Sequence, residues 1–112
     1  MLPTENRLKN SEEFRFVKLR GYSVGTNYLL ISYFNRKDDK ATRFGFVVTR
    51  KIDRRAVVRN RISRLMREAI RKNLDNIKKG YDVVLVARSD FETMNDCDRE
   101  VARILKKAKL IS

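Results

Sequence analysis

One segment carries more than half of the net charge of this chain and limits how the chain can fold. Residues 50–72, with the sequence RKIDRRAVVRNRISRLMREAIRK, hold ten basic side chains and two acids, a balance of +8 out of +13 for all 112 residues. A positive field this concentrated raises the local concentration of polyanions and speeds their capture. Any fold of the chain must therefore keep one face of this segment accessible.

The same segment has the spacing of an amphipathic helix. Apolar residues recur at the spacing of one helix face, namely Ile62, Leu65, Met66, Ala69 and Ile70. At about 100° per residue a second stripe lies roughly opposite and consists of Asn60, Arg64, Arg67 and Arg71. Arginine suits bidentate contact with phosphate. A merely solvated charged face would normally interleave acids for i,i+4 pairing, whereas Glu68 is almost alone. The pattern predicts a nucleic-acid-binding helix.

Composition excludes several other classes. A chain of 112 residues with 42% apolar residues predicts a single domain, 1–112, with a modest core. There is no apolar run of about 18 residues, and the N-terminus lacks the apolar run of a signal peptide. One cysteine, Cys97, among acids that disfavour a thiolate, indicates a cytoplasmic protein without an internal disulfide.

The absence of histidine removes a His general base, a Ser-His or Cys-His pair and an ordinary zinc site. The carboxylates are scattered, and the adjacent Asp38 and Asp39 do not naturally converge on one metal. We therefore expect no catalytic residue, no metal ligand and no bound cofactor in this chain, and no cleavage by the chain alone.

Periodicity and turn residues predict an α+β order of elements. Residues 1–8 are expected to form a loosely ordered arm, and a helix capped by Asn10 or Ser11 ends at Gly21. Residues 27–34 and 43–49 predict two antiparallel strands joined by a polar hairpin turn at 35–41. A helix over 57–74, an apolar and hence central strand over 81–87, and a helix from 95 or 96 to 107 follow. Together these elements predict helices covering part of a small mixed sheet.

Aromatic residues suggest a second surface. Phe14 and Phe16 are two apart on a helix and so point about 200° apart, which keeps them out of the same core. One of them exposed could stack on an unpaired base, worth roughly 1–3 kcal/mol per base, although both could also simply meet opposite neighbours. Tyr28 and Phe34 share a strand face, where they could line a groove or belong to an ordinary core.

Four stretches resemble the protein subunit of bacterial ribonuclease P. The run AVVRNRISRLMREAIR is similar to the basic R-N-R motif of that family, centred on Arg59-Asn60-Arg61. The preceding TRKIDRRA resembles the family's basic lead-in to the helix. The N-terminal NRLKNSEEFRFV resembles its opening helix, and YDVVLVAR its strand after the basic helix. The resemblance covers residues 6 to 108.

This resemblance implies a fold and a function. The fold would be a single-domain α-β-β-β-α-β-α sandwich with a left-handed β-α-β crossover, like the second domain of the fifth small-subunit ribosomal protein. The function would be that of a ribonucleoprotein endonuclease that removes the 5′ leader of precursor tRNA. Its partners would be a catalytic RNA that uses Mg²⁺ and the precursor tRNA, with no membrane and no required protein partner.

The resemblance also implies two sets of contact residues. Candidates for contact with the catalytic RNA are Arg50, Lys51, Arg54, Arg55, Arg59, Asn60, Arg61, Arg64, Arg67 and Arg71. Candidates for a cleft between the first helix and the sheet, which would hold the single-stranded leader, are Phe14, Phe16, Lys18 and Tyr28. Lys18 stands where the family often has a third aromatic residue, so phosphate contact would replace stacking there.

Three alternatives remain open from the residues alone. A structural RNA-binding protein of the ribosomal type would have similar size and charge, but it would not need a groove for a single strand. A DNA-binding regulator would need a short helix at a tight turn before the basic helix, where RFGFVVT instead predicts a strand. A self-sufficient nuclease conflicts with the absence of histidine and of clustered carboxylates.

Overall fold

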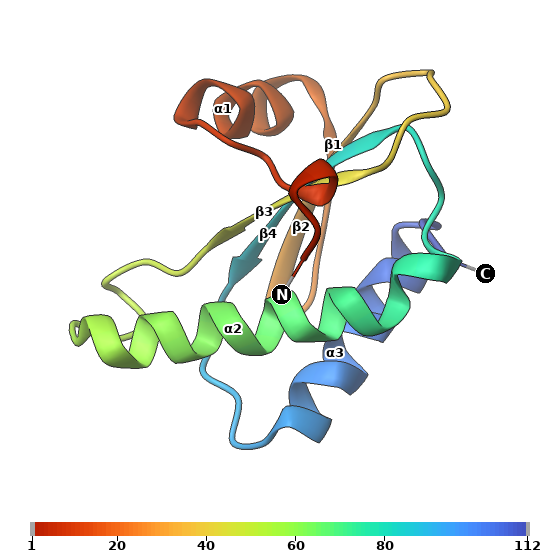
Figure 1. The fold of residues 1–112 in the computed structure, drawn as a ribbon. Coiled ribbons are helices and arrows are strands. Elements are labelled where there is room, and N and C mark those ends of the chain that lie inside the picture. The colour runs from red at the N-terminus through yellow and green to blue at the C-terminus, as the bar shows by residue number, and fades with distance from the viewer. Residues whose placement is uncertain (1, 112) are drawn as a thin grey trace.

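A computed structural model describes residues 2–111 of the chain. Two short 3₁₀ turns, Thr4–Asn6 and Leu74–Asn76, accompany three helices and four strands. In chain order these are α1 (Ser11–Arg20), β1 (Tyr22–Gly25), β2 (Leu29–Asn35), β3 (Arg43–Val47), α2 (Ala56–Asn73), β4 (Tyr81–Ala87) and α3 (Met94–Lys107). Figure 1 shows α1 on one side of the sheet and α2 and α3 on the other. The expected α+β class and element order are confirmed.

The sheet is mixed, with strand order β1-β2-β4-β3. Strand β4 pairs antiparallel with β2 and parallel with β3, so it is the central strand that its apolar sequence predicts. The expected hairpin between β2 and β3 is wrong, because β4 lies between these two strands. Residues 36–42 are therefore not a hairpin turn but a connection that crosses the end of β4.

Strand β1 was not among the strands located from hydrophobic pattern, although the family resemblance implied three strands before the basic helix. Its sequence, YSVG, is short, and its first two residues are exposed. It pairs antiparallel with β2 at the edge of the sheet, with Tyr22 opposite Tyr33 and Gly25 opposite Leu30. Four residues at a solvent-exposed edge, with Val24 as the single aliphatic side chain, leave almost no alternating signal.

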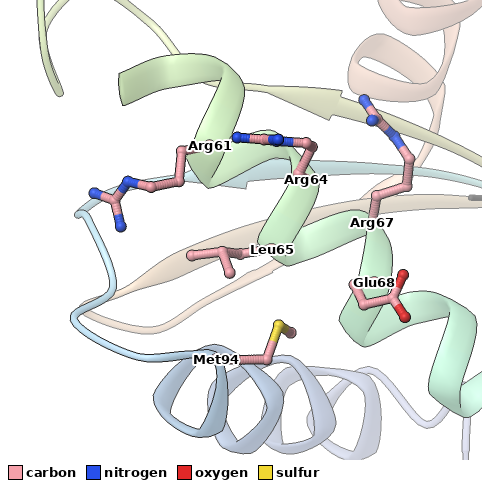
Figure 2. A pocket seen from close by; sticks show the side chains of 6 residues that line it. All are labelled: Arg61, Arg64, Leu65, Arg67, Glu68 and Met94. Carbon is pink, nitrogen blue, oxygen red and sulfur yellow. The ribbon is translucent and has the colours of Figure 1, made fainter. Parts of the chain in front are cut away.

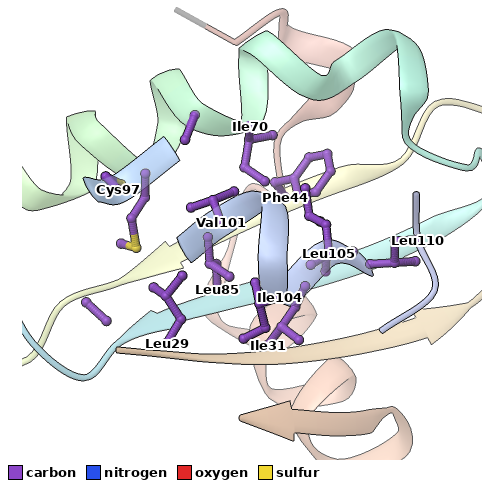
Figure 3. Close-up of a cluster of buried hydrophobic side chains, with 14 of the residues drawn as sticks. Leu29, Ile31, Phe44, Ile70, Leu85, Cys97, Val101, Ile104, Leu105 and Leu110 are labelled. Atoms are coloured by element: carbon purple, nitrogen blue, oxygen red, sulfur yellow. The ribbon is translucent and has the colours of Figure 1, made fainter. Parts of the chain in front are cut away.

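The main core lies between the sheet and the two helices α2 and α3 (Figure 3). Helix α2 contributes the expected stripe, with Ile62, Met66, Ala69 and Ile70 buried and Leu65 half-buried. Helix α3 contributes Val101, Ile104, Leu105 and, just beyond its end, Ala108, together with Cys97. These side chains meet Leu29 and Ile31 of β2 and Leu85 of β4, which alternate toward the same face.

A second, smaller core lies under α1. Val17 is fully buried there against Leu8 and Val84, and Phe14 packs beside them. The ring of Phe14 lies directly on the backbone of β3, because a Cβ atom placed on Gly45 would come within 2.3 Å of the Phe14 Cζ atom. Glycine at this strand position therefore permits the close approach of α1 to the sheet.

Side-chain caps mark the starts of α1 and α3, and glycines close α1 and precede β4. Asn10 caps α1 by accepting a hydrogen bond from the Glu13 N–H at 2.9 Å, and Gly21 closes its last turn through a bond to the Val17 carbonyl. Thr93 caps α3 in the same way through the Asp96 N–H. Gly80, at φ 88°, provides the left-handed turn before β4.

The segment before α1 is packed, which corrects the expectation of a loosely ordered arm over residues 1–8; Met1 itself lies outside the described residues. Leu2 is only 1% exposed and belongs to the main core. Asn6 donates to the Thr42 carbonyl at 2.8 Å, and the Leu8 N–H donates to the Phe44 carbonyl at 2.9 Å. The segment thus continues the sheet edge beside β3. Within residues 2–111, no helix is both long and apolar enough to cross a bilayer.

Candidate nucleic-acid interface

Helix α2 turns its basic stripe away from the core. Asn60, Arg64 and Arg71 are exposed, while Arg67 is half-buried. Because Ile62 and Met66 are fully buried on the other side, the helix cannot rotate without losing its apolar contacts. The core thus fixes which side chains of α2 face outward.

The basic residues divide into two groups according to their partners. In the first group the charge is already engaged within the protein. Arg55 bonds Asp53 at 3.0 Å, Arg61 bonds Asp90 at 2.5 Å, and Arg71 bonds Glu68. Arg59 donates instead to two backbone carbonyls, those of Asp53 at 3.1 Å and Arg54 at 2.7 Å.

The second group has no such partner. Arg50, Lys51, Arg54 and Arg64 form no ion pair with any residue between 2 and 111, and all four are exposed. Arg67 lies over the ring of Phe46, 5.6 Å from its centroid, and keeps its charge available. These five side chains carry the part of the positive field that an outside anion can use.

The lead-in to α2 is ordered by its single acid. Asp53 Oδ1 accepts from both the backbone N–H and the Nε of Arg55, at 2.8 and 3.0 Å. The Arg55 side-chain hydrogen bond, followed by the backbone bond, lowers the pKa of Asp53 to about 2. Asp53 therefore stays ionised and holds the loop in one shape next to the free cations Arg50, Lys51 and Arg54.

On the opposite face of the sheet, a hollow of about 350 Å³ lies between α1 and the ends of the strands. Its lining residues are Asn10, Glu12, Glu13, Phe16, Phe34, Arg36, Arg43 and Asp82. Phe16 is 46% exposed and meets Phe34 edge to face, with ring centroids 5.0 Å apart and planes at 79°. The hollow therefore offers an aromatic edge to solvent.

The four residues expected in this cleft are not all brought together. Phe16 lines it, whereas Phe14 is packed over Gly45, so one phenylalanine is exposed and the other packed. Lys18 is exposed on α1. Tyr28 precedes the other end of β2, about 20 Å along the strand from Phe34, and stacks on Phe91 at 6.5 Å.

Sequence reasoning missed the charged end of the cleft. Asp82, 5% exposed, accepts from Arg36 at 2.5 Å and from Arg43 at 2.8 Å, and Arg43 also reaches Glu13 at 2.7 Å. Hydrogen bonds to Asp38 and then Asp82 raise the pKa of Arg36, and a bond to Asp82 raises that of Arg43. An aspartate within the apolar run YDVVLVA was the signal, since a buried carboxylate needs cationic partners.

Neither the cysteine thiol nor the acidic side chains of the described residues form a reactive site. Cys97 is fully buried, and burial, followed by the nearby Asp98, raises the pKa of its thiol to about 12. The thiol is therefore neutral at physiological pH and is no nucleophile. Residues 2–111 contain no group of three or more His, Cys, Asp or Glu side chains placed to hold a metal ion.

Comparison with known proteins shows the family to which this chain belongs. The sequence model of the family described as Ribonuclease P matches residues 2–109. The chain belongs to the ribonuclease P protein family. A relative from Clostridium botulinum, named ribonuclease P protein component, is 40% identical over 107 residues, which cover 93% of this chain and 95% of the relative.

Solved structures of this family share the fold. The RNase P protein of Staphylococcus aureus superposes with a TM-score of 0.86 at 27% identity, covering 96% of this chain and 98% of that one. The RNase P protein of Thermotoga maritima gives a TM-score of 0.70 at 28% identity, covering 93% of this chain and 94% of that one. The family expected from the R-N-R motif and its flanking stretches is thereby confirmed.

Proposed function

We propose that this protein binds the catalytic RNA of ribonuclease P through α2 and its lead-in, and holds the 5′ leader of precursor tRNA between α1 and the sheet. The holoenzyme would remove the leader by endonucleolytic cleavage and so mature the tRNA 5′ end. The observation that carries this proposal is the row of cations on α2 and residues 50–54 that have no acidic partner among the described residues.

Electrostatics give the protein a role without catalytic side chains. The catalytic RNA and the precursor are both polyanions, and their close packing costs repulsion that a protein of net charge +13 lowers. The holoenzyme should therefore need less Mg²⁺ than the RNA alone. The Mg²⁺ would be bound and used by the catalytic RNA. The protein's arginines would contact phosphates of that RNA. The cytoplasmic location expected from the sequence stays a prediction.

The leader would be held by stacking and backbone charge. The exposed edge of Phe16 against Phe34 offers a surface for an unpaired base, and such contacts tolerate most sequences. Because only the precursor still has a leader, this cleft would favour precursor over mature tRNA. The location of α1, which carries Phe16, and of α2 on opposite faces of the sheet supports two separate RNA contacts.

The test is cleavage of a precursor tRNA by the cognate catalytic RNA at low Mg²⁺, with and without the protein. We expect the protein to restore cleavage, Arg64→Ala to weaken assembly, and Phe16→Ala to weaken binding of precursor but not of mature tRNA. Arg71→Ala is the matched control for Arg64→Ala, because it removes the same charge from a side chain already paired with Glu68, and its effect should be smaller.

A different outcome would favour the structural RNA-binding protein. If the protein binds both RNAs but leaves cleavage unchanged, and Phe16→Ala has no effect on precursor binding, the two-surface proposal is wrong.

A further inference from the structure

A hollow of about 410 Å³ lies where the middle of α2 meets the start of α3 (Figure 2). Figure 2 shows Leu65 of α2 and Met94 of α3 facing each other across it, and both are half-buried and pack against the main core. The remaining lining residues, Arg61, Arg64, Arg67 and Glu68, all come from α2. An apolar floor is thus surrounded mainly by arginine.

Phosphate binding alone does not account for this floor. A phosphate needs donors and positive charge, and the free side chain of Arg64 supplies both, but it gains nothing from Leu65 or Met94. A nucleobase needs an apolar face to cover its ring and stacks well on planar guanidinium groups. The methionine thioether adds favourable contact with an aromatic edge.

We propose that this hollow receives one unpaired base of the catalytic RNA, with the ring over Leu65 and Met94 and the attached phosphate on Arg64. The proposal rests on the function proposed above and names the RNA feature that α2 recognises: an unstacked nucleotide rather than a uniform run of phosphates. The volume lies in the range of roughly 300–1,000 Å³ typical of sites for small organic groups.

Charge selects a nucleic acid over other occupants. Three of the six lining residues are arginines, and Arg64 has no acidic partner within residues 2–111. The carboxylate of Glu68 is bonded by Arg71, whose hydrogen bond lowers the pKa of Glu68 and keeps it ionised. Arg61 is held at Asp90, in the loop that leads into α3, and so helps to fix the two walls relative to each other.

Binding measurements with the catalytic RNA can separate the base contact from the charge contact. We expect Met94→Ala to weaken binding about tenfold, because it removes apolar surface that the base would cover, and to leave the slope of log affinity against log salt unchanged. Met94→Leu keeps an apolar side chain and should recover most of the affinity. Arg64→Ala should weaken binding and also reduce that slope by about 0.7 to 0.9, since it removes one phosphate contact.

A direct readout uses the methionine methyl groups. Met66 is fully buried and serves as an internal control for the fold, whereas Met94 lines the hollow. In NMR spectra of the methyl-labelled full chain, adenosine 5′-monophosphate should shift the Met94 signal through the ring current of its base. Ribose 5-phosphate and inorganic phosphate should leave that signal nearly unchanged, and the Met66 signal should not move.

The two proposals fail in different ways. If Arg64→Ala weakens RNA binding while Met94→Ala does not, the base site is wrong and the RNA-binding function stands. If neither variant affects binding, both are wrong. A larger Met94 shift with an acidic peptide than with adenosine 5′-monophosphate would also overturn the base site in favour of a protein partner.

Discussion

At the scale of single residues, arginines of equal charge on α2 have different roles, because some are bonded within the protein and others are not. Arg64 faces solvent without a partner in residues 2–111, whereas Arg59 donates hydrogen bonds to the backbone carbonyls of Asp53 and Arg54. The family resemblance implies RNA contact for both, because neither a motif nor charge carries information about backbone carbonyls brought near by the lead-in loop.

This difference predicts that alanine at position 59 changes the stability of the fold, whereas alanine at position 64 does not. Arg59→Ala should release the lead-in loop, lower the free energy of unfolding by about 1 kcal/mol, and speed amide hydrogen exchange in residues 50–56. Arg64→Ala should leave the free energy of unfolding and these exchange rates unchanged, because the Arg64 side chain forms no hydrogen bond or ion pair within residues 2–111. Equal exchange rates in the two variants would show that Arg59 does not organise the loop.

Phe14 and Phe16 show where prediction from sequence ends at this scale. Helical periodicity establishes that the two rings point apart, but it does not say which one enters a core. The answer depends on Gly45, 31 positions after Phe14 in the chain, whose missing side chain leaves room for the Phe14 ring. Only the fold brings these two residues together.

At the scale of elements, helices were located well and strand pairing was not. Helix α2 begins and ends within one residue of its expected bounds, and α1 begins after the expected cap, because helix signals are local. The insertion of β4 between β2 and β3 depends on contacts between distant segments. No local pattern in residues 35–41 distinguishes a hairpin turn from a longer crossing.

The contact between α1 and β3 can be tested at Gly45. Gly45→Ala should lower the free energy of unfolding by about 1–3 kcal/mol, because the new Cβ atom would overlap the Phe14 ring. In the double variant with Phe14→Ala the cost should be less than the sum of the single costs by about 1 kcal/mol. Urea denaturation measures all three values.

Gly25→Ala on β1 is the matched control for Gly45→Ala. The three heavy atoms nearest to its added Cβ atom all belong to the guanidinium group of Arg88, the nearest at 3.0 Å, and this flexible end can move aside. This variant should therefore be milder than Gly45→Ala. Strictly additive costs for Gly45→Ala and Phe14→Ala would mean that the ring does not limit position 45.

The start of α1 should respond to pH through Glu13. The bond from the Lys9 N–H, followed by the charge of Arg43, lowers the pKa of Glu13 despite the opposing effect of burial. A lowered pKa in the folded state means that the stabilisation is present above the ordinary value of 4.5 and is lost as pH falls through the folded value. Glu13→Gln should therefore flatten the pH dependence of thermal stability below pH 4.5; an unchanged pH profile would contradict this role.

At the scale of the whole molecule, the sheet separates two surfaces whose residues the sequence suggests but whose relative position it does not. The basic stripe lies with α2 and α3 on one face, and the exposed Phe16 lies with α1 on the other (Figure 1). Local periodicity predicted the basic stripe, whereas the cleft beside the first helix was implied by the family resemblance. Their placement on opposite faces follows from sheet order, which is a property of the complete fold.

Net charge is the remaining property of the whole molecule, and it predicts how the fold depends on anions. A domain at +13 repels itself, and the cations Arg50, Lys51, Arg54 and Arg64 have no internal partner among the described residues to offset this. An anion that binds only the folded state stabilises it by an amount that grows with its concentration, about 2.7 kcal/mol at 100 times the dissociation constant. Sulfate should therefore raise the melting temperature more than sodium chloride does at equal ionic strength. The double variant Arg54→Ala with Arg64→Ala should lose much of this increase. The control double variant, Arg71→Ala with Arg99→Ala, removes two cations already paired with acids and should lose less of it. An equal increase with chloride and sulfate would mean that screening alone, and no bound anion, relieves the repulsion.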